Sequence, residues 1–294
     1  MELLQRASSE LPIDVREAIV RGLSIEQTGT AASRALQTIL DNVDLSQQQG
    51  TPLCQDTGAN IWHVHHPQAV STPALTRDIR AATAEACRRS ILRRNAVDAV
   101  TGRNSGNNLG VDFPFITFSQ WKQKSIAASV MLKGGGCENV SAQYALPDER
   151  LHAGRDLEGV RRVVLDAVYS AGGRGCAPGI LGVGIGGDRV TGMMTAKNQL
   201  FRLLTDTNPV ASLAALEERI LTEANDLGIG PMGFGGRTTL LGVKIGALHR
   251  VPASMFVSIS YMCWACRRCS VIIHPDGRTV FGNRAIPPAR GHRS

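Results

Sequence analysis

The chain has 294 residues, of which 43% are hydrophobic and 19% charged, so its composition is that of a globular protein with a sizeable core. Its net charge is +7, but the lysines and arginines are scattered and only 4% of residues are aromatic, which argues against a nucleic-acid groove. No hydrophobic run has the length of a membrane span, and the acidic N-terminal stretch has no export signal, so we expect a cytoplasmic protein.

The predicted elements, taken along the chain, mix helices with strands. Apolar residues at three- and four-residue spacing predict helices near the N-terminus, at 14–20 and 31–40, and again at 157–171. We expect further helices at 72–93, 190–204 and 209–227, and strands at 115–119, 125–132, 179–185, 240–248, 255–261 and 270–273. Without a repeat or a clear linker, this predicts one mixed α/β domain over residues 1–280, with mixed sheets and flanking helices, followed by a C-terminal tail at 281–294.

Seven cysteines are the first chemical signal in the chain. An odd number of cysteines in a chain without an export signal argues against a disulfide framework. In a reducing compartment, clustered cysteines are more often metal or cluster ligands, whereas isolated ones are usually small core residues.

Two turn-forming segments combine reactive side chains with glycine. Residues 52–58, PLCQDTG, place a thiol, an amide, a carboxylate and a hydroxyl just before Gly58. Residues 133–139, KGGGCEN, place three glycines after a predicted strand, an arrangement that lets backbone N–H groups face an anion. The alternatives are a helix-capping turn for the first segment and a plain hairpin bend for the second.

A third segment contains Cys176 and a G-x-G-x-x-G pattern at Gly182, Gly184 and Gly187. With Asp206 about twenty residues farther on, the pattern resembles a dinucleotide-binding fingerprint. However, Asp206 lies in a predicted helix-to-helix turn, and the segment after the glycines lacks the apolar face of a first Rossmann helix. A nicotinamide-dependent oxidoreductase is therefore kept only as a competing hypothesis.

The fourth segment has the spacing C-x2-C-x2-C at Cys263, Cys266 and Cys269. A zinc site requires a second pair of ligands, and a ferredoxin run requires a fourth cysteine three residues later. His274-Pro275 follows instead, so the run completes neither site. A non-catalytic iron–sulfur or zinc protein remains a third hypothesis.

These segments together resemble the signature segments of class I fumarases and L(+)-tartrate dehydratases. Residues 52–58, 133–136, 175–178 and 262–265 occur in the family's order and at similar separations, and the similarity extends to 92–97 and 225–231. The chain resembles the α subunit of the two-subunit members, which corresponds to the N-terminal half of the single-chain members.

The resemblance implies a [4Fe–4S] cluster held by Cys54, Cys176 and Cys263. Three cysteines bind three of the four irons and leave the fourth without a protein ligand. Such an iron acts as a Lewis acid that stabilises hydroxide as a leaving group. The implied reaction is the addition or removal of water on a four-carbon dicarboxylate, with Gln55 and Asp56 at catalytic positions beside the substrate.

Further residues match the family's substrate-binding positions. Arg93 matches a carboxylate-binding arginine, and residues 133–136 (Lys133, Gly134, Gly135 and Gly136) match the loop that faces the other carboxylate. A family histidine stands twelve positions before the third cysteine, where this chain has Val251. His249 fills that role only if the alignment has a two-residue gap.

The sequence departs from the family pattern in two ways. Cys266 and Cys269 are extra cysteines, and the family's C-terminal half is absent from this sequence. We therefore expect a β subunit as partner, in an α2β2-type heteromer, with no nucleic acid and no membrane involved. Residues 133–141 are closer to fumarase-type α subunits, so fumarate/malate is the first choice of substrate and tartrate is the alternative.

Overall fold

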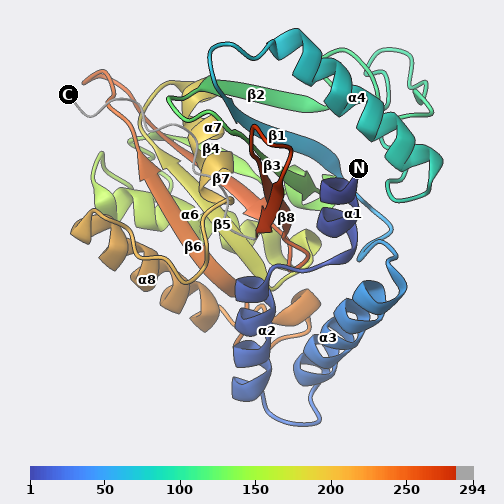
Figure 1. Ribbon diagram of the computed structural model, residues 1–294. Helices are drawn as coiled ribbons and strands as arrows, with labels where there is room; N and C mark the ends of the chain where they lie inside the picture. The colour runs from blue at the N-terminus through green and yellow to red at the C-terminus, as the bar shows by residue number, and fades with distance from the viewer. Residues whose placement is uncertain (283–294) are drawn as a thin grey trace. The chain divides into compact units, whose positions relative to one another are not determined.

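The computed structural model describes residues 1–282, and its two mixed sheets with flanking helices confirm the predicted mixed α/β fold (Figure 1). The chain divides into two compact units. Unit 1 comprises Met1–Ile13, Asn42–Gly135 and the segment from Ala265 onward, and unit 2 comprises Asp14–Asp41 and Gly136–Trp264. The single domain expected over residues 1–280 stays a prediction, and of the expected tail, residues 283–294 lie outside the described part.

Unit 1 contains a five-stranded sheet in the order β2-β1-β3-β8-β9. Strand β1 pairs in parallel with β2 and antiparallel with β3, and β8 lies antiparallel between β3 and β9. The strands are β1 (Ala59–His66), β2 (Phe115–Gln120), β3 (Ile126–Lys133), β8 (Arg267–Ile273) and β9 (Thr279–Gly282).

Helices α1 (Glu2–Ser9) and α4 (Thr72–Arg88) bury one face of this sheet. Their apolar residues form one core with those of β1, β3 and β8, which includes Leu4, Trp62 and Val130. Helix α4 begins where predicted, because Ser71 accepts a capping hydrogen bond from the N–H of Ala74.

Unit 2 contains a four-stranded sheet in the order β4-β7-β5-β6. Helix α7 packs across β5 and β7, α8 packs against β6, and α6 packs against α8 and β7. The strands are β4 (Ala142–Leu146), β5 (Gly179–Ile185), β6 (Leu240–Ala247) and β7 (Met255–Met262). The remaining helices are α2 (Ile13–Ile25), α3 (Ala31–Gln49), α5 (Gly135–Asn139), α6 (Leu157–Ala171), η1 (Gly172–Gly175), α7 (Arg189–Gln199), α8 (Ala211–Asp226) and η2 (Pro231–Gly233).

Several elements differ from the sequence prediction. Strands β1, β4 and β9 were not expected, and residues 135–139 form a short helix instead of an open loop. Helix α4 ends at Arg88 rather than at residue 93. Within residues 1–282, no helix combines the length and the apolar character needed to cross a bilayer.

Candidate functional site

The turn at 54–58 is closed in unit 1 by the carboxylate of Asp56. Its Oδ1 accepts from the backbone N–H of Gly58 at 2.9 Å, and its Oδ2 accepts from the N–H of Gly135 at 2.8 Å. Hydrogen bonds to an ionised carboxylate are stronger than neutral ones. One side chain therefore shapes the cysteine-bearing turn and ties it to the glycine-rich segment.

Asn95 is a second organiser of the same turn. Its side-chain amide donates to Asp56 Oδ1 at 3.2 Å and lies within 3.4 Å of Thr57 Oγ1 and within 3.3 Å of the Gly58 carbonyl oxygen. Thr57 Oγ1 also accepts from the backbone N–H of Arg93 at 3.0 Å. The sequence indicates no role for Asn95, and the only signal in it is the position of Asn95 inside the family-like segment 92–97.

Gly58 permits the close approach of the two segments. Its φ is +75°, and a Cβ built on it would lie 2.4 Å from the carbonyl carbon of Lys133. A side chain is excluded there by both the backbone conformation and the space available. The glycine at the end of the PLCQDTG segment is thus required by geometry.

One open cavity of about 660 Å³ is lined by three predicted site residues, Cys54, Gln55 and Arg93. Gln55 and Arg93 are exposed, and Cys54 is partly exposed. An exposed guanidinium beside an amide can bind a carboxylate with directional hydrogen bonds. The other lining residues are Pro52, Thr57, Cys87, Arg88, Ser90, Leu92 and Arg94.

The glycine-rich segment partly differs from its expected role as an anion cradle. Lys133 is buried at the end of β3, and α5 begins at Gly135. Because the N–H of Gly135 donates to Asp56, it does not face a substrate while that hydrogen bond persists. Gly136 is exposed.

In unit 2, Cys176 lies on an exposed turn in the left-handed conformation, with φ +54°. Its carbonyl oxygen accepts from the backbone N–H of Trp264 at 3.4 Å, which joins this turn to the one carrying Cys263. Cβ atoms built on Gly175 and Gly179 would lie 2.5 and 2.3 Å from the ring of Tyr261. The glycines flanking Cys176 therefore let its turn pack directly on that ring.

Three cysteines, Cys137, Cys176 and Cys263, lie around the buried ring of Tyr261. Burial is the main cause that raises the pKa of Tyr261, and electrostatic interactions with Cys263, Cys137 and Cys176 raise it further. Cys137 is buried, with its Sγ 3.9 Å from Met262 Sδ, whereas Cys176 is exposed and Cys263 is partly exposed. Unit 2 thus brings the two predicted ligands Cys176 and Cys263 to one end of its sheet.

Exposure separates the seven cysteines into two groups. Cys54, Cys176 and Cys263 are the three that are not buried, and the other four are buried. Burial raises the pKa of Cys87 and raises that of Cys269 to about 11, which keeps both as protonated thiols.

Iron is bound by thiolates, so the exposure of three cysteines and the burial of the other four fit a cluster with three cysteine ligands. Residues 1–282 contain no group of three or more His, Cys, Asp or Glu side chains arranged to hold a single metal ion.

His249 is not brought to the cysteines of unit 2. It follows β6, and its carbonyl oxygen accepts from the N–H of Gly187, beyond the C-terminal end of β5. Cys176 precedes the N-terminal end of β5, and Cys263 follows the antiparallel strand β7 at that same end. A seven-residue strand is about 20 Å long, so His249 lies at the opposite end of the sheet.

The G-x-G-x-x-G pattern has a packing role in unit 2. Gly182 and Gly184 lie inside β5, where a Cβ would come within 2.0 Å of the Ala196 carbonyl oxygen and 2.2 Å of the Gly192 carbonyl oxygen, respectively. These glycines let α7 pack directly on the strand. In a dinucleotide fingerprint the glycines form the turn after the strand, so this geometry disfavours the nicotinamide hypothesis.

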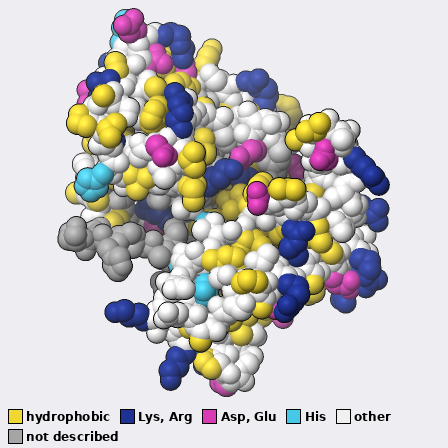
Figure 2. Space-filling view, turned by 90° about the horizontal axis from the view of Figure 1, so that it is seen from above, with side chains coloured by type: hydrophobic (Ala, Val, Ile, Leu, Met, Phe, Trp, Pro, Cys, Tyr) yellow, Lys and Arg dark blue, Asp and Glu magenta, His cyan; other side chains and the backbone are white. Residues whose placement is uncertain are grey.

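Two other surface features are less suited to catalysis. Figure 2 shows Lys and Arg side chains scattered over the face it presents, interspersed with hydrophobic and acidic groups.

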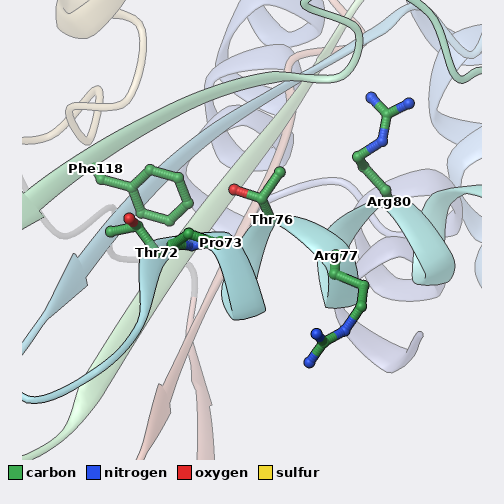
Figure 3. Close-up of a pocket in the computed structure, with 6 residues that line it drawn as sticks. All are labelled: Thr72, Pro73, Thr76, Arg77, Arg80 and Phe118. Carbon is green, nitrogen blue, oxygen red and sulfur yellow. The ribbon is translucent and has the colours of Figure 1, made fainter.

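A cavity of about 470 Å³ at the start of α4 places Phe118 beside Thr72 and Pro73, but Arg77 and Arg80 point apart (Figure 3). Arg80 is bound to the carbonyl oxygens of residues 110 and 113, so the two arginines form no anion site.

The chain is similar in sequence to proteins named as fumarate hydratases and tartrate dehydratases. The family described as fumarate hydratase (fumerase) matches residues 1–272. A Geobacillus stearothermophilus protein, provisionally named a class I fumarate hydratase, is 48% identical over 278 residues, which cover 94% of this chain and 54% of that protein.

Two relatives are named as α subunits. A Methanocaldococcus jannaschii protein, provisionally named an L(+)-tartrate dehydratase subunit alpha, is 31% identical over 95% of this chain and 97% of its own length. The L(+)-tartrate dehydratase subunit alpha of Escherichia coli (strain K12) is 29% identical over 92% of this chain and 88% of its own length. The chain thus spans about half of the Geobacillus protein and most of each named α subunit.

Proposed function

Because the chain belongs to the fumarate hydratase family, we propose that it is the α subunit of a [4Fe–4S] hydro-lyase that interconverts fumarate and malate. One observation carries this proposal. Of the seven cysteines, the three on the family-like turns are those that are not buried. Identity to the relative named for fumarate, at 48%, also exceeds identity to those named for tartrate, at 29–31%.

Cys54, Cys176 and Cys263 are the proposed ligands of the cluster. When bound, the cluster supplies a Lewis acid that favours the departure of the substrate hydroxyl. The chain contributes the rigidity of the ligand turns: Asp56 closes the turn of Cys54, and Tyr261 supports the turn of Cys176. A rigid ligand set lowers the cost of organising the centre.

Binding of the dicarboxylate falls to side chains near Cys54. Arg93 is exposed in the same cavity as Gln55 and offers two parallel N–H donors to a carboxylate. Gln55 can donate to, or accept from, the hydroxyl that is added or removed. Asp56 lies next to Gln55, and its three hydrogen-bond donors favour a role in orienting the turn.

The remaining carboxylate contacts are proposed for the segment after β3. Lys133 supplies positive charge at the start of the loop, and the exposed Gly136 offers its backbone N–H to the second carboxylate. His249 is left out because it lies at the other end of its sheet. The proton-transferring group is assigned to a β subunit, in a cytoplasmic α2β2-type heteromer.

The test is activity of the two-subunit enzyme. The chain is co-expressed with its β subunit, reconstituted anaerobically with iron and sulfide, and assayed with fumarate, malate and both enantiomers of tartrate. We expect turnover of fumarate and malate to exceed that of either tartrate. Turnover of L(+)-tartrate alone would make the enzyme a tartrate dehydratase, and NAD-dependent oxidation of malate would contradict the proposal.

A further inference from the structure

Arg267 is the largest fully buried side chain in the described residues, with 1% of its surface exposed. It is the first residue of β8 and pairs with Leu132 of β3. Because side chains alternate along a strand, Arg267 lies on the same face as Cys269 and Val271, the face covered by α1. A permanently charged group is thus placed in a mainly apolar layer.

The hydrogen bonding of this guanidinium is incomplete. Nη2 donates to the backbone carbonyl oxygen of Asp56 at 2.8 Å. Its Nε and Nη1 are buried and have no hydrogen-bond acceptor among residues 1–282. A buried charge without an ion partner is costly, so it persists in a fold only when something compensates it.

The position of Arg267 suggests what compensates this charge. The carbonyl that it holds belongs to the Cys54 turn, and Cα atoms two residues apart are separated by at most about 7 Å. A [4Fe–4S] cluster together with three thiolate ligands carries a net negative charge, and charges at this range inside a protein are little screened. A buried cation that has no ion partner among residues 1–282 and that contacts a ligand turn is therefore complementary to an anionic centre on that turn.

On the basis of the proposed function, we propose that Arg267 is a positioning residue for the cluster. It fixes the Cys54 turn through the Asp56 carbonyl and supplies a buried positive charge that stabilises the anionic thiolate–cluster assembly. Residues behind metal ligands tune both affinity and redox potential in this way. Arg267 does not touch the substrate, so it acts through the ligand turn.

Arg268 provides a matched control. It is also buried, at 2% exposed, and its Nη1 donates to Cys266 Sγ at 3.4 Å. Because it follows Arg267 in the strand, it points to the opposite face of the sheet. Arg267→Met removes the charge and keeps much of the volume, Arg267→Lys keeps the charge, and Arg268→Met removes a neighbouring buried charge.

The experiment uses the α chain in complex with its β subunit, reconstituted anaerobically. For each variant, the iron released to a chelator and the reduction potential of the cluster are measured. We expect Arg267→Met to lower iron affinity about 10–100-fold. We also expect a more negative potential, because the added electron loses a nearby cation. Arg267→Lys should keep a potential close to that of the wild type, and Arg268→Met should change neither quantity.

The outcomes separate this inference from the proposed function. A wild-type complex that binds no cluster would overturn both. A wild-type complex with a cluster, together with an Arg267→Met complex of unchanged affinity and potential, would overturn the inference alone. If Arg267→Met fails to fold, Arg267→Lys decides: a folded protein with a wild-type potential supports the charge role, and a shifted potential contradicts it.

Discussion

The carboxylate of Asp56 and the backbone N–H of Gly135, 79 residues apart in sequence, are joined by a hydrogen bond of 2.8 Å. The same carboxylate closes the Cys54 turn through Gly58. This pair of hydrogen bonds makes the position of the proposed ligand depend on the end of β3. The stability of unit 1 should therefore respond to changes in this one side chain.

Asp56→Asn removes the charge but keeps one acceptor oxygen. We expect a loss of about 1–3 kcal/mol in the free energy of unfolding, since hydrogen bonds to charged groups are the stronger ones. Urea unfolding of the cluster-free chain measures this loss. Asp112→Asn, at an exposed residue, is the control and should be neutral. Equal effects of the two changes would show that the Asp56 hydrogen bonds contribute nothing.

Gly58→Ala tests the contact between the two segments. The new Cβ would meet the Lys133 carbonyl carbon at 2.4 Å, in addition to the strain of φ +75°. Gly102 has a similar φ of +69° with nothing within 4 Å of its Cβ position, so Gly102→Ala shows the conformational cost alone. Gly58→Ala should be more destabilising by at least about 1 kcal/mol. Equal losses in urea unfolding would contradict the close approach.

The buried side chain of His63 should make the free energy of unfolding depend on pH. Burial is the main cause that lowers the pKa of His63 to about 4, and the nearby His65 lowers it further. Between pH 6.5 and pH 4 the unfolded chain takes up a proton at this position while the folded chain does not, so stability falls as the pH falls. We expect this group to account for about 1–3 kcal/mol of that loss.

The measurement for His63 is urea unfolding of the cluster-free chain across this pH range. His63→Gln removes the titrating group and should flatten the pH dependence. His249→Gln, at an exposed histidine, should leave it as in the wild type. A His63→Gln profile parallel to that of the wild type would show that His63 titrates normally in the fold.

A substitution at Gly184 tests whether the glycines of the G-x-G-x-x-G pattern serve helix packing or nucleotide binding. In Gly184→Ala the added methyl group would lie 2.2 Å from the carbonyl oxygen of Gly192 in α7, so we expect a loss of about 1–3 kcal/mol. Gly110→Ala, whose nearest contact would be 3.8 Å, is the control. Tryptophan fluorescence of the wild type should show no saturable quenching by NADH. Saturable quenching that Gly184→Ala abolishes would restore the nicotinamide hypothesis.

The sequence predicted the parts of the fold that rest on local patterns. Helix α6 follows from its apolar spacing, and β5 follows from a short apolar run bounded by turn residues. Strand β1 was missed because its sequence, ANIWHVHH, contains polar residues that the fold buries, including His63 and His65. Such burial depends on partners that are distant in sequence, and no local pattern reveals it.

The candidate site also has features that the local sequence predicts and features that depend on contacts between distant residues. The cysteine-bearing turns were found from their glycines and reactive side chains, and the choice of Cys263 among three closely spaced cysteines needed the family resemblance. The roles of Asn95 and Arg267 are contacts with the 54–58 turn across long sequence separations. Nothing in their immediate sequence indicates such contacts, so only the structure could reveal them.

The identity of the three cluster ligands is the central claim, and a single set of serine variants tests it most directly. Iron and sulfide content and the electron paramagnetic resonance signal are measured after anaerobic reconstitution of the complex with its β subunit. We predict that Cys54→Ser, Cys176→Ser and Cys263→Ser each lose the cluster, whereas Cys269→Ser keeps it. Retention of the cluster by Cys54→Ser and Cys176→Ser, with its loss in Cys269→Ser, would contradict the account and favour a site built on the C-terminal cysteines.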